Sequence, residues 1–399
     1  MYSIVQEVQN RLDKVLGLTR ENLTGVRVLR AFCKEEEQEA EFQKQNQILT
    51  DTQKFVGRIS ALLNPLTYVI INVAIIALIW IGAIRVDLGI ITQVVALYNY
   101  MSQILTELIK LANLIINITK SVACGNRIQS VLEVEPSVKD RAAMLSGAGE
   151  AGKSAYRVVF EHAGIRYPDA AQEAVSDITL NVRPGETIGV IGGTGSGKSS
   201  LVNLIPRFYD CSSGAVYVDG RNVCTYGLTE LRDKIGVVPQ KSVLFAGTIR
   251  SNMQWGKPDA TDEEIFAALE IAQAKDVVSK KEKGLDTEVE QGGKNFSGGQ
   301  RQRLTIARAL VKQPEILILD DSSSALDFAT DAALRMAIGS MKHKPTLFIV
   351  SQRTSAIQYA DKIVVLDDGS VVGIGTHEEL MNTCEVYREI YDSQYKRTN

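Results

Sequence analysis

The chain has 399 residues, enough for two or three domains. Its formal net charge is −3 at pH 7, so electrostatics give no reason to expect nucleic-acid binding. The five cysteines are scattered without a C-x-x-C pair, and there are only three histidines. This composition argues against a zinc site, a redox pair and a disulfide-stapled secreted fold.

The N-terminal part is expected to be helical and charged. Over residues 1–55, apolar residues recur at helical spacing, most clearly from Val5 to Leu18. A short interruption is expected at residues 24–27. The acidic run that follows at residues 34–37 is interpreted as a solvated helix face.

Two long stretches without charge come next. No charged residue lies between Arg58 and Arg85, which exceeds the roughly 20 residues that a helix needs to cross a bilayer. The second stretch, which ends at Glu107, is more polar, and this favours contact with a cavity or another helix. We expect membrane spans at about 59–84 and 88–112. The alternative is that both are buried helices of a soluble domain.

From Tyr156 onward, strand-like and helix-like segments alternate. This rhythm is typical of an α/β domain with a largely parallel sheet. A mostly helical insertion is expected at about residues 241–300. The strands are expected at residues 157–160, 187–191, 235–239, 316–319, 346–350 and 362–366.

A glycine-rich segment between an expected strand and an expected helix fits the pattern G-x-x-x-x-G-K-S. Strand, loop and helix in this order are what a phosphate-binding loop requires. Its backbone N–H groups would surround phosphates, Lys198 would reach the β- and γ-phosphates, and the Ser199 hydroxyl would hold Mg²⁺. The candidate residues are Gly192, Gly193, Thr194, Gly195, Ser196, Gly197, Lys198, Ser199 and Ser200.

A second match to the same pattern, residues 147–154, lacks this context. No strand precedes it, and residues 156–160 after it look like a strand instead of a helix. We interpret it as part of a flexible linker over residues 136–156. The expected fold is therefore an α/β P-loop nucleotide-binding domain with a helical insertion, preceded by a partial all-α transmembrane domain.

Two further segments contain candidate residues for binding Mg²⁺, water or phosphate. Asp320 ends a buried strand and would bind Mg²⁺ directly or through water, and Asp321 stands where a carboxylate could orient an attacking water. The polar, glycine-rich segment 297–300 opens an expected helix, whose N-terminus suits a phosphate. Because one nucleotide does not need two phosphate cradles on one chain, the site is expected to be shared between two facing nucleotide domains.

With these motifs in this order, the chain resembles the ABC transporter superfamily, specifically the exporter half-transporters that fuse a membrane domain to a nucleotide-binding domain. The resemblance covers nearly the whole chain. It implies that Tyr167 stacks on adenine and that Gln240 contacts Mg²⁺ and senses the membrane domain. Asp327 lies in a loop, residues 324–327, that resembles the one contacting the other subunit. The signature that faces the partner's ATP is matched by Ser297, Gly298, Gly299 and Gln300.

The resemblance also implies the organisation of the chain. Residues 1–135 would be a partial exporter transmembrane domain, with a coupling helix at about 22–32, and residues 157–399 the nucleotide-binding domain. Since such membrane domains have six spans and two are expected here, the chain is expected to be N-terminally truncated, as a fragment, as the product of a truncated gene or through a start codon assigned too late. It would be a multi-pass protein of the cell membrane with its nucleotide-binding domain in the cytoplasm, and an ATPase that uses ATP and Mg²⁺.

Three positions depart from the family pattern. Asp321 stands where the family has its catalytic glutamate, and Gln352 where it has the switch histidine. Glu290 and Gln291 replace a Gly-Glu pair before the signature. With Ser199, Gln240 and Asp320 retained as metal ligands, the site is expected to bind ATP and to hydrolyse it weakly. This resembles heterodimeric exporters and implies an unlike partner half-transporter that carries the missing glutamate and histidine.

Two other functions compete with an exporter subunit. A non-transport ABC-type ATPase of DNA repair or chromosome organisation would carry long coiled coils, which the short insertion and the two spans argue against. A membrane-anchored regulatory or inert ATP binder would fit the truncation and the two substitutions. Partner-dependent ATP hydrolysis separates this hypothesis from an exporter subunit, whose transported solute the sequence does not identify.

Overall fold

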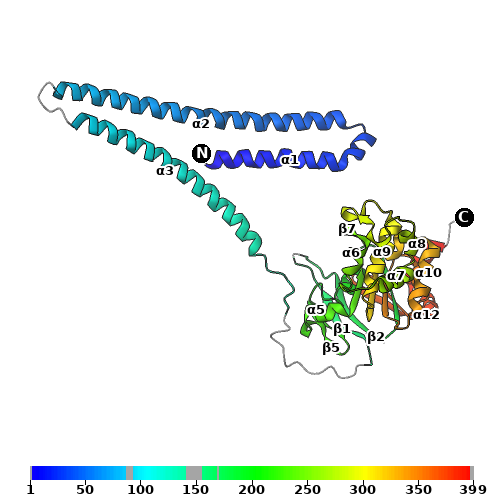
Figure 1. Cartoon of the computed structure of the whole chain (residues 1–399). Helices are drawn as coiled ribbons and strands as arrows, with labels where there is room; N and C mark the ends of the chain where they lie inside the picture. Colours follow the sequence, from blue (N-terminus) through cyan, green and yellow to red (C-terminus); the bar gives the residue numbers. More distant parts are fainter. Residues whose placement is uncertain (1, 87–92, 141–154, 169, 396–399) are drawn as a thin grey trace. The chain divides into compact units, whose positions relative to one another are not determined.

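The structure, a computed structural model, describes residues 2–86, 93–140, 155–168 and 170–395 (Figure 1). The chain divides into two compact units, Met1–Val134 and Glu135–Asn399. The second match to the phosphate-loop pattern, residues 147–154, lies outside the described residues, as does most of the expected linker.

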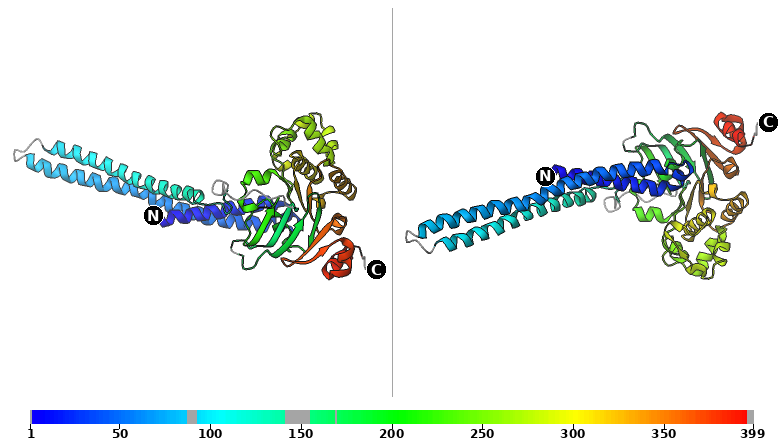
Figure 2. Two further views of the ribbon diagram at one scale, coloured as in Figure 1. Left: turned by 90° about the horizontal axis from the view of Figure 1, so that it is seen from below. Right: turned by 90° about the horizontal axis from the view of Figure 1, so that it is seen from above.

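The first unit contains three helices, α1 (Tyr2–Ala31), α2 (Glu35–Val86) and α3 (Gln93–Leu132). Helix α1 packs along α2 (Figures 1 and 2), with Val15 and Leu49 buried between them.

The expected interruption at residues 24–27 is wrong, because α1 continues through it to Ala31. The Thr24 hydroxyl donates to the carbonyl of Arg20 at 2.9 Å, a bond that a helix accommodates, and Gly25 costs an exposed helix only about 1 kcal/mol. The chain turns later, at Cys33, whose φ of 53° is left-handed. The segment expected as a coupling helix therefore forms the last turns of α1 and the start of this turn.

Part of α2 is long and apolar enough to cross a membrane. The segment Pro65–Ile84 has a mean hydropathy of 2.3, and most of its side chains are exposed. It falls within the span expected at 59–84. The span expected at 88–112 begins in residues outside the described part, and no second window in the described helices meets the same criterion.

The second unit is built on a six-stranded sheet in the order β12-β11-β3-β10-β9-β6. All neighbours pair in parallel except the edge strand β12, so the expected α/β fold with a largely parallel core is confirmed. The strands are β3 (Thr187–Gly192), β6 (Ile235–Val238), β9 (Ile316–Asp320), β10 (Thr346–Val350), β11 (Lys362–Asp367) and β12 (Ser370–Gly375).

A separate antiparallel sheet has the strand order β2-β1-β4-β5. Of its strands, the sequence pattern predicted only β1, as the strand expected at residues 157–160. A two-stranded sheet, β7-β8, lies in the insertion. These strands are β1 (Val158–Ile165), β2 (Val175–Val182), β4 (Ser213–Val218), β5 (Arg221–Asn222), β7 (Gly247–Thr248) and β8 (Glu288–Val289).

Helices pack against the sheets, and α-helices and 3₁₀ turns together form about half of the expected insertion at 241–300. Those of the second unit are α4 (Lys198–Asn203), α5 (Leu228–Asp233), α6 (Ile249–Gln254), α7 (Asp262–Ile271), α8 (Lys275–Ser279), α9 (Gly298–Val311), α10 (Phe328–Gly339), α11 (Thr354–Ile357), α12 (His377–Thr383) and α13 (Glu385–Tyr395), with 3₁₀ turns at 223–225, 284–286, 291–293 and 322–325.

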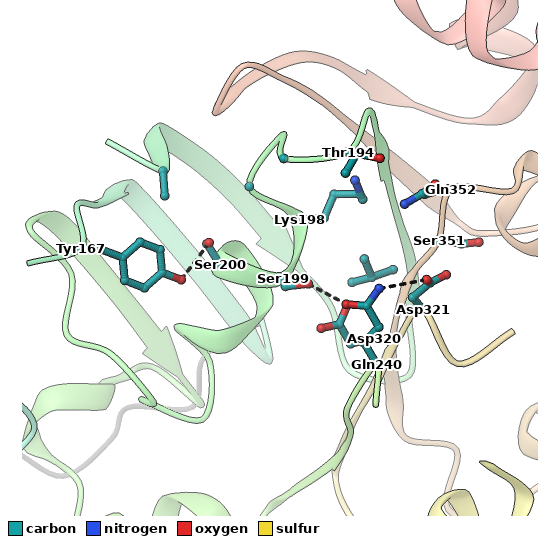
Figure 3. A pocket seen from close by; sticks show the side chains of 14 residues that line it. Tyr167, Thr194, Lys198, Ser199, Ser200, Gln240, Asp320, Asp321, Ser351 and Gln352 are labelled. Carbon is teal, nitrogen blue, oxygen red and sulfur yellow. Dashed lines mark hydrogen bonds between the residues drawn. The ribbon is translucent and has the colours of Figure 1, made fainter. Parts of the chain in front are cut away.

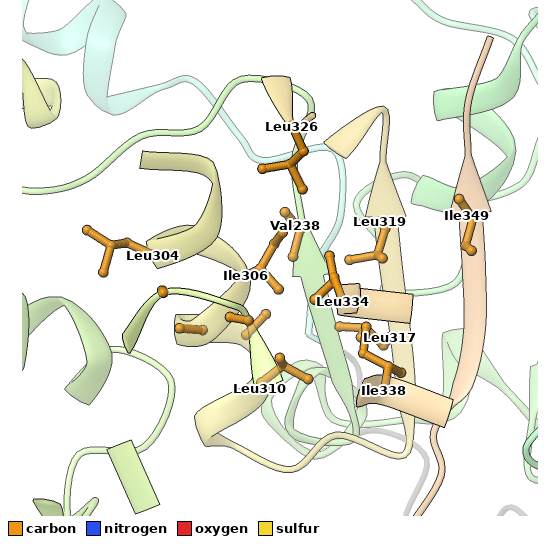
Figure 4. Packing of buried hydrophobic residues seen from close by; sticks show 14 of the residues in the cluster. Val238, Leu304, Ile306, Leu310, Leu317, Leu319, Leu326, Leu334, Ile338 and Ile349 are labelled. Atoms are coloured by element: carbon orange, nitrogen blue, oxygen red, sulfur yellow. The ribbon is translucent and has the colours of Figure 1, made fainter. Parts of the chain in front are cut away.

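The core holds the carboxyl ends of the parallel strands in register. Leu317 and Leu319 of β9 pack with residues of α9 and α10, such as Ile306 and Leu334 (Figure 4). Val350 of β10 pairs with both Val190 of β3 and Asp320 of β9. The segments that leave these three strands therefore emerge side by side, as is usual at a ligand site of an α/β sheet.

Candidate nucleotide-binding site

A pocket of about 350 Å³ lies at this edge of the sheet (Figure 3). The loop after β3, the residues after β9 and those after β10 meet in it. Its lining consists of Tyr167, Ala174, Thr194, Gly195, Gly197, Lys198, Ser199, Ser200, Gln240, Asp320, Asp321, Val350, Ser351 and Gln352. The structure thus brings together in one place most of the residues expected to form this chain's own ATP site.

The loop depends on glycine backbone geometry where it enters α4. Gly195 and Gly197 have φ values of 85° and 90°, in the region that only glycine adopts without strain. A Cβ on Gly197 would lie 2.3 Å from the carbonyl oxygen of Ala174, which no side-chain rotation relieves. By contrast, a Cβ on Gly193 would meet nothing within 4 Å.

These contacts give a matched pair of variants. Gly197→Ala is expected to destabilise the nucleotide-free chain by about 2 kcal/mol, because backbone strain and a backbone clash add. Gly193→Ala should leave stability within about 0.5 kcal/mol of wild type. Thermal unfolding without nucleotide measures both, and equal melting temperatures for the two variants would contradict the expectation.

Lys198 lies folded back over the loop that precedes it. Its ammonium donates to the carbonyl oxygens of Gly192 at 2.9 Å and Gly193 at 2.5 Å. Burial lowers the pKa of Lys198, and the nearby charges of Asp321 and Asp320 oppose that shift. The cation is therefore buried at the pocket wall, bonded to neutral carbonyls, where a phosphate would be a stronger partner.

Ser199 and Asp320 form a pair that fits a Mg²⁺ ion. The Ser199 hydroxyl donates to Oδ1 of Asp320 at 3.0 Å (Figure 3). Burial raises the pKa of Asp320, and the neighbouring charge of Asp321 adds to this, while the bond from Ser199 opposes it. The charge of Lys198 also opposes the rise. Burial disfavours the charged form of the carboxylate, and a divalent cation bound by oxygen ligands would stabilise that form.

Asp321 and Gln240 are hydrogen-bonded to each other in the pocket lining. Nε2 of Gln240 donates to Oδ2 of Asp321 at 3.3 Å, although 81 positions separate them. The backbone N–H of Asp321 donates to the carbonyl of Val350 at 2.9 Å, and its φ is 46°. The short side chain of Asp321 is therefore held close to the strand ends.

Gln352 and Ser351 come from the end of β10. Gln352 lines the pocket as expected, and so does Ser351, which the sequence motifs do not predict as a site residue. Ser351 donates its N–H to the carbonyl of Val190 at 3.1 Å and accepts a bond from the N–H of Arg353 at 3.0 Å. Ser351 could have been predicted as a pocket residue from its position, because it directly precedes Gln352 at the end of a buried strand.

Tyr167 forms one wall of the pocket. Its hydroxyl lies 2.9 Å from Oγ of Ser200, and its ring meets Tyr209 edge to face at 5.0 Å between centroids. These two contacts fix the plane of the ring, which leaves an aromatic surface beside the phosphate loop.

The predicted signature and Asp327 are not in this pocket. Ser297 caps α9 in a capping box: its hydroxyl accepts from the N–H of Gln300 at 3.3 Å, and its own N–H donates to Oε1 of Gln300 at 3.1 Å. Asp327 caps α10 through the N–H of Thr330 at 2.9 Å, and hydrogen bonds from Thr330 lower its pKa. Both helix starts are thus ordered apart from the pocket of their own chain.

Comparison with known proteins shows which family the chain resembles. A family model described as ABC transporter matches residues 175–324, and one described as ABC transporter transmembrane region matches residues 1–108. The uncharacterized ABC transporter ATP-binding protein YfiB of Bacillus subtilis is 38% identical over 99% of this chain and 68% of its own length. A putative multidrug export ATP-binding/permease protein, YgaD, of the same organism is 34% identical over 98% of this chain and 66% of its own length. The chain thus spans about two thirds of each relative.

A solved structure matches nearly the whole chain. A bacterial Atm1-family ABC exporter with ATP bound superimposes with a TM-score of 0.85 and 26% identity. The match covers 99% of this chain and 69% of that one.

Proposed function

The chain belongs to the ABC transporter family, as an exporter-type half-transporter with a transmembrane region followed by an ATPase domain, and on this premise we propose that its own pocket holds ATP and Mg²⁺ but hydrolyses ATP slowly. Lys198 would bind the β- and γ-phosphates, Tyr167 would stack on adenine, and Ser199, Gln240 and Asp320 would hold the metal. When bound, Mg²⁺ would neutralise charge on the phosphates.

The pair Asp321 and Gln352 carries the proposal. Both line the pocket, and they are the residues that would orient water and contact the γ-phosphate. The side chain of Asp321 is one methylene shorter than that of a glutamate, and its carboxylate already accepts a bond from Gln240, so it would lie further from an attacking water than a glutamate carboxylate would. Displacements of about 1 Å in a catalytic group can cost on the order of a hundredfold in rate.

Gln352 cannot replace an imidazole in proton transfer. Its amide can hydrogen-bond to a phosphate oxygen, but it neither gains nor loses a proton near neutral pH. The residues present are therefore suited to binding the triphosphate and poorly suited to the chemical step.

We further propose an unlike partner subunit. The ordered signature, Ser297–Gln300, lies outside its own chain's pocket and would face ATP bound by the partner, with Asp327 at the shared interface. The partner would carry, in its own pocket, the glutamate and histidine that this chain lacks. Residues 1–135 would form the partial transmembrane domain, residues 136–156 the linker and residues 157–399 the nucleotide-binding domain. The chain would cross the cell membrane more than once, with its nucleotide-binding domain in the cytoplasm.

Single-turnover measurement tests the proposal. The full chain in lipid nanodiscs is incubated with Mg²⁺ and radiolabelled ATP, separated from free nucleotide, and the bound nucleotide is identified over time. We expect it to remain ATP for many minutes, also after a half-transporter with both missing residues is added, because that glutamate and histidine would lie in the partner's own pocket. With fresh ATP, total hydrolysis should rise once the partner is present. Steady-state turnover of about 1 s⁻¹ or more by the chain alone would contradict the proposal.

A further inference from the structure

The C-terminal helix α13 reaches the loop that carries Gln352. Oε1 of Gln394 accepts hydrogen bonds from both the N–H and the hydroxyl of Thr354, each at 3.0 Å. Nε2 of the same side chain donates to the backbone carbonyl of Gln352 at 2.7 Å. One side chain thus bonds to both ends of the turn from Gln352 to α11, across 40 and 42 positions of sequence.

The helix that presents Gln394 is anchored in the core. Tyr387 of α13 is fully buried, and its hydroxyl lies 2.8 Å from Nδ1 of His377 at the start of α12. Helix α13 also contacts α11, α12 and β11. These contacts anchor α13 to the rest of the unit, so Gln394 reaches the turn from a packed helix.

The turn needs such support because its pocket side is open. Ser351 is bonded to β3 through Val190, but the next residue, Gln352, is exposed. Thr354, on the far side of the turn, is fully buried. We propose that Gln394 is a positioning residue that sets the backbone of Gln352, so that α13 controls how the γ-phosphate is recognised. This inference rests on the proposed role of Gln352 in ATP binding.

The two ends of the Gln394 amide allow a sharp pair of variants. Gln394→Ala removes all three bonds. Gln394→Glu keeps an acceptor for Thr354 but places an oxygen against the carbonyl of Gln352, where a donor is needed. Ser393→Ala is the matched control, because its hydroxyl bonds within α13 to the carbonyl of Ile390 at 2.7 Å.

The test compares affinities for fluorescent ATP and ADP analogues, with Mg²⁺, on the full chain in lipid nanodiscs. We expect Gln394→Ala and Gln394→Glu each to raise the Kd for ATP by about fivefold, which is the usual worth of one such hydrogen bond. The Kd for ADP, which lacks the γ-phosphate, should change less than about twofold. Ser393→Ala should match the wild type for both nucleotides.

Hydrogen exchange provides a readout without nucleotide. The amide of Thr354 is expected to exchange faster in Gln394→Ala than in wild type, and to stay protected in Gln394→Glu, which keeps its acceptor. Retained protection in Gln394→Ala would overturn the inference.

Further outcomes separate this inference from the proposed function. If Gln352→Ala weakens ATP binding while Gln394→Ala does not, the inference alone is overturned. If Gln352→Ala leaves the affinity for ATP unchanged, the role of Gln352 and the inference both fail. Equal losses for ATP and ADP in Gln394→Ala, with a lower melting temperature, would show a purely structural residue and also overturn it.

Discussion

Replacing Lys198 with alanine is expected to weaken ATP binding by about a hundredfold. The ammonium is buried at the pocket wall and bonded to the carbonyls of Gly192 and Gly193, so it is already in place when a nucleotide arrives. Charge-assisted hydrogen bonds contribute about 1.5–3 kcal/mol, and a loss of about 2.7 kcal/mol corresponds to a factor of a hundred in Kd. Equilibrium binding of a fluorescent ATP analogue to the full chain measures the change.

The chain itself provides the control for this variant. Lys153 occupies the same place in the second G-x-x-x-x-G-K-S pattern, which is predicted to lie in a linker. Lys153→Ala is expected to bind ATP like the wild type. A loss in Lys153→Ala as large as that in Lys198→Ala would contradict the prediction that only the pattern at residues 192–199 binds phosphate.

Restoring the two missing family residues is expected to raise ATP hydrolysis by about a hundredfold. In Asp321→Glu/Gln352→His, the added methylene would advance the carboxylate toward the attacking water, and the imidazole could take part in proton transfer. A correctly positioned general acid or base raises the rate of the chemical step by about 10²-fold or more. Steady-state phosphate release by the full chain, alone and with a complementary half-transporter, measures the gain.

A length-matched variant isolates the contribution of charge. Asp321→Gln/Gln352→His has the same reach as the glutamate variant but no carboxylate, so it is expected to stay as slow as the wild type. Equal hydrolysis by wild type and the glutamate variant would contradict the weak-site proposal and favour a competent homodimer. A gain in both double variants would assign the effect to the Gln352→His substitution instead of the carboxylate at position 321.

Local patterns in the sequence were sufficient for the strands and loops that form the pocket. The strand before Gly192 and the helix after it are adjacent in the chain, so pattern and mechanism could be matched directly. The strand ending in Asp320 is a continuous apolar run, typical of a buried parallel strand. Both predictions rest on neighbours in sequence, where propensity and burial act together.

The features that the sequence did not predict depend on distant residues or on small energy differences. The bond from Gln240 to Asp321 and the bonds from Gln394 arise only once the sheet order is known, since nothing in the local pattern links these segments. The helix break was misplaced because Thr24 and Gly25 lower helix propensity by amounts that a 30-residue helix can absorb.

The capping box of α9 has a consequence for how selection would act on this chain. Ser297 and Gln300 complete each other's hydrogen bonds within one turn, so the start of α9 is ordered by its own residues and not by nucleotide in the chain's own pocket. Under the proposed division of labour, substitutions at Asp321 would be close to neutral, whereas those at Ser297 would impair the complex. Two sites in one domain would then evolve under different constraints. Selection on Asp321 would be weak, whereas Ser297 would be conserved because the partner subunit's ATP depends on it.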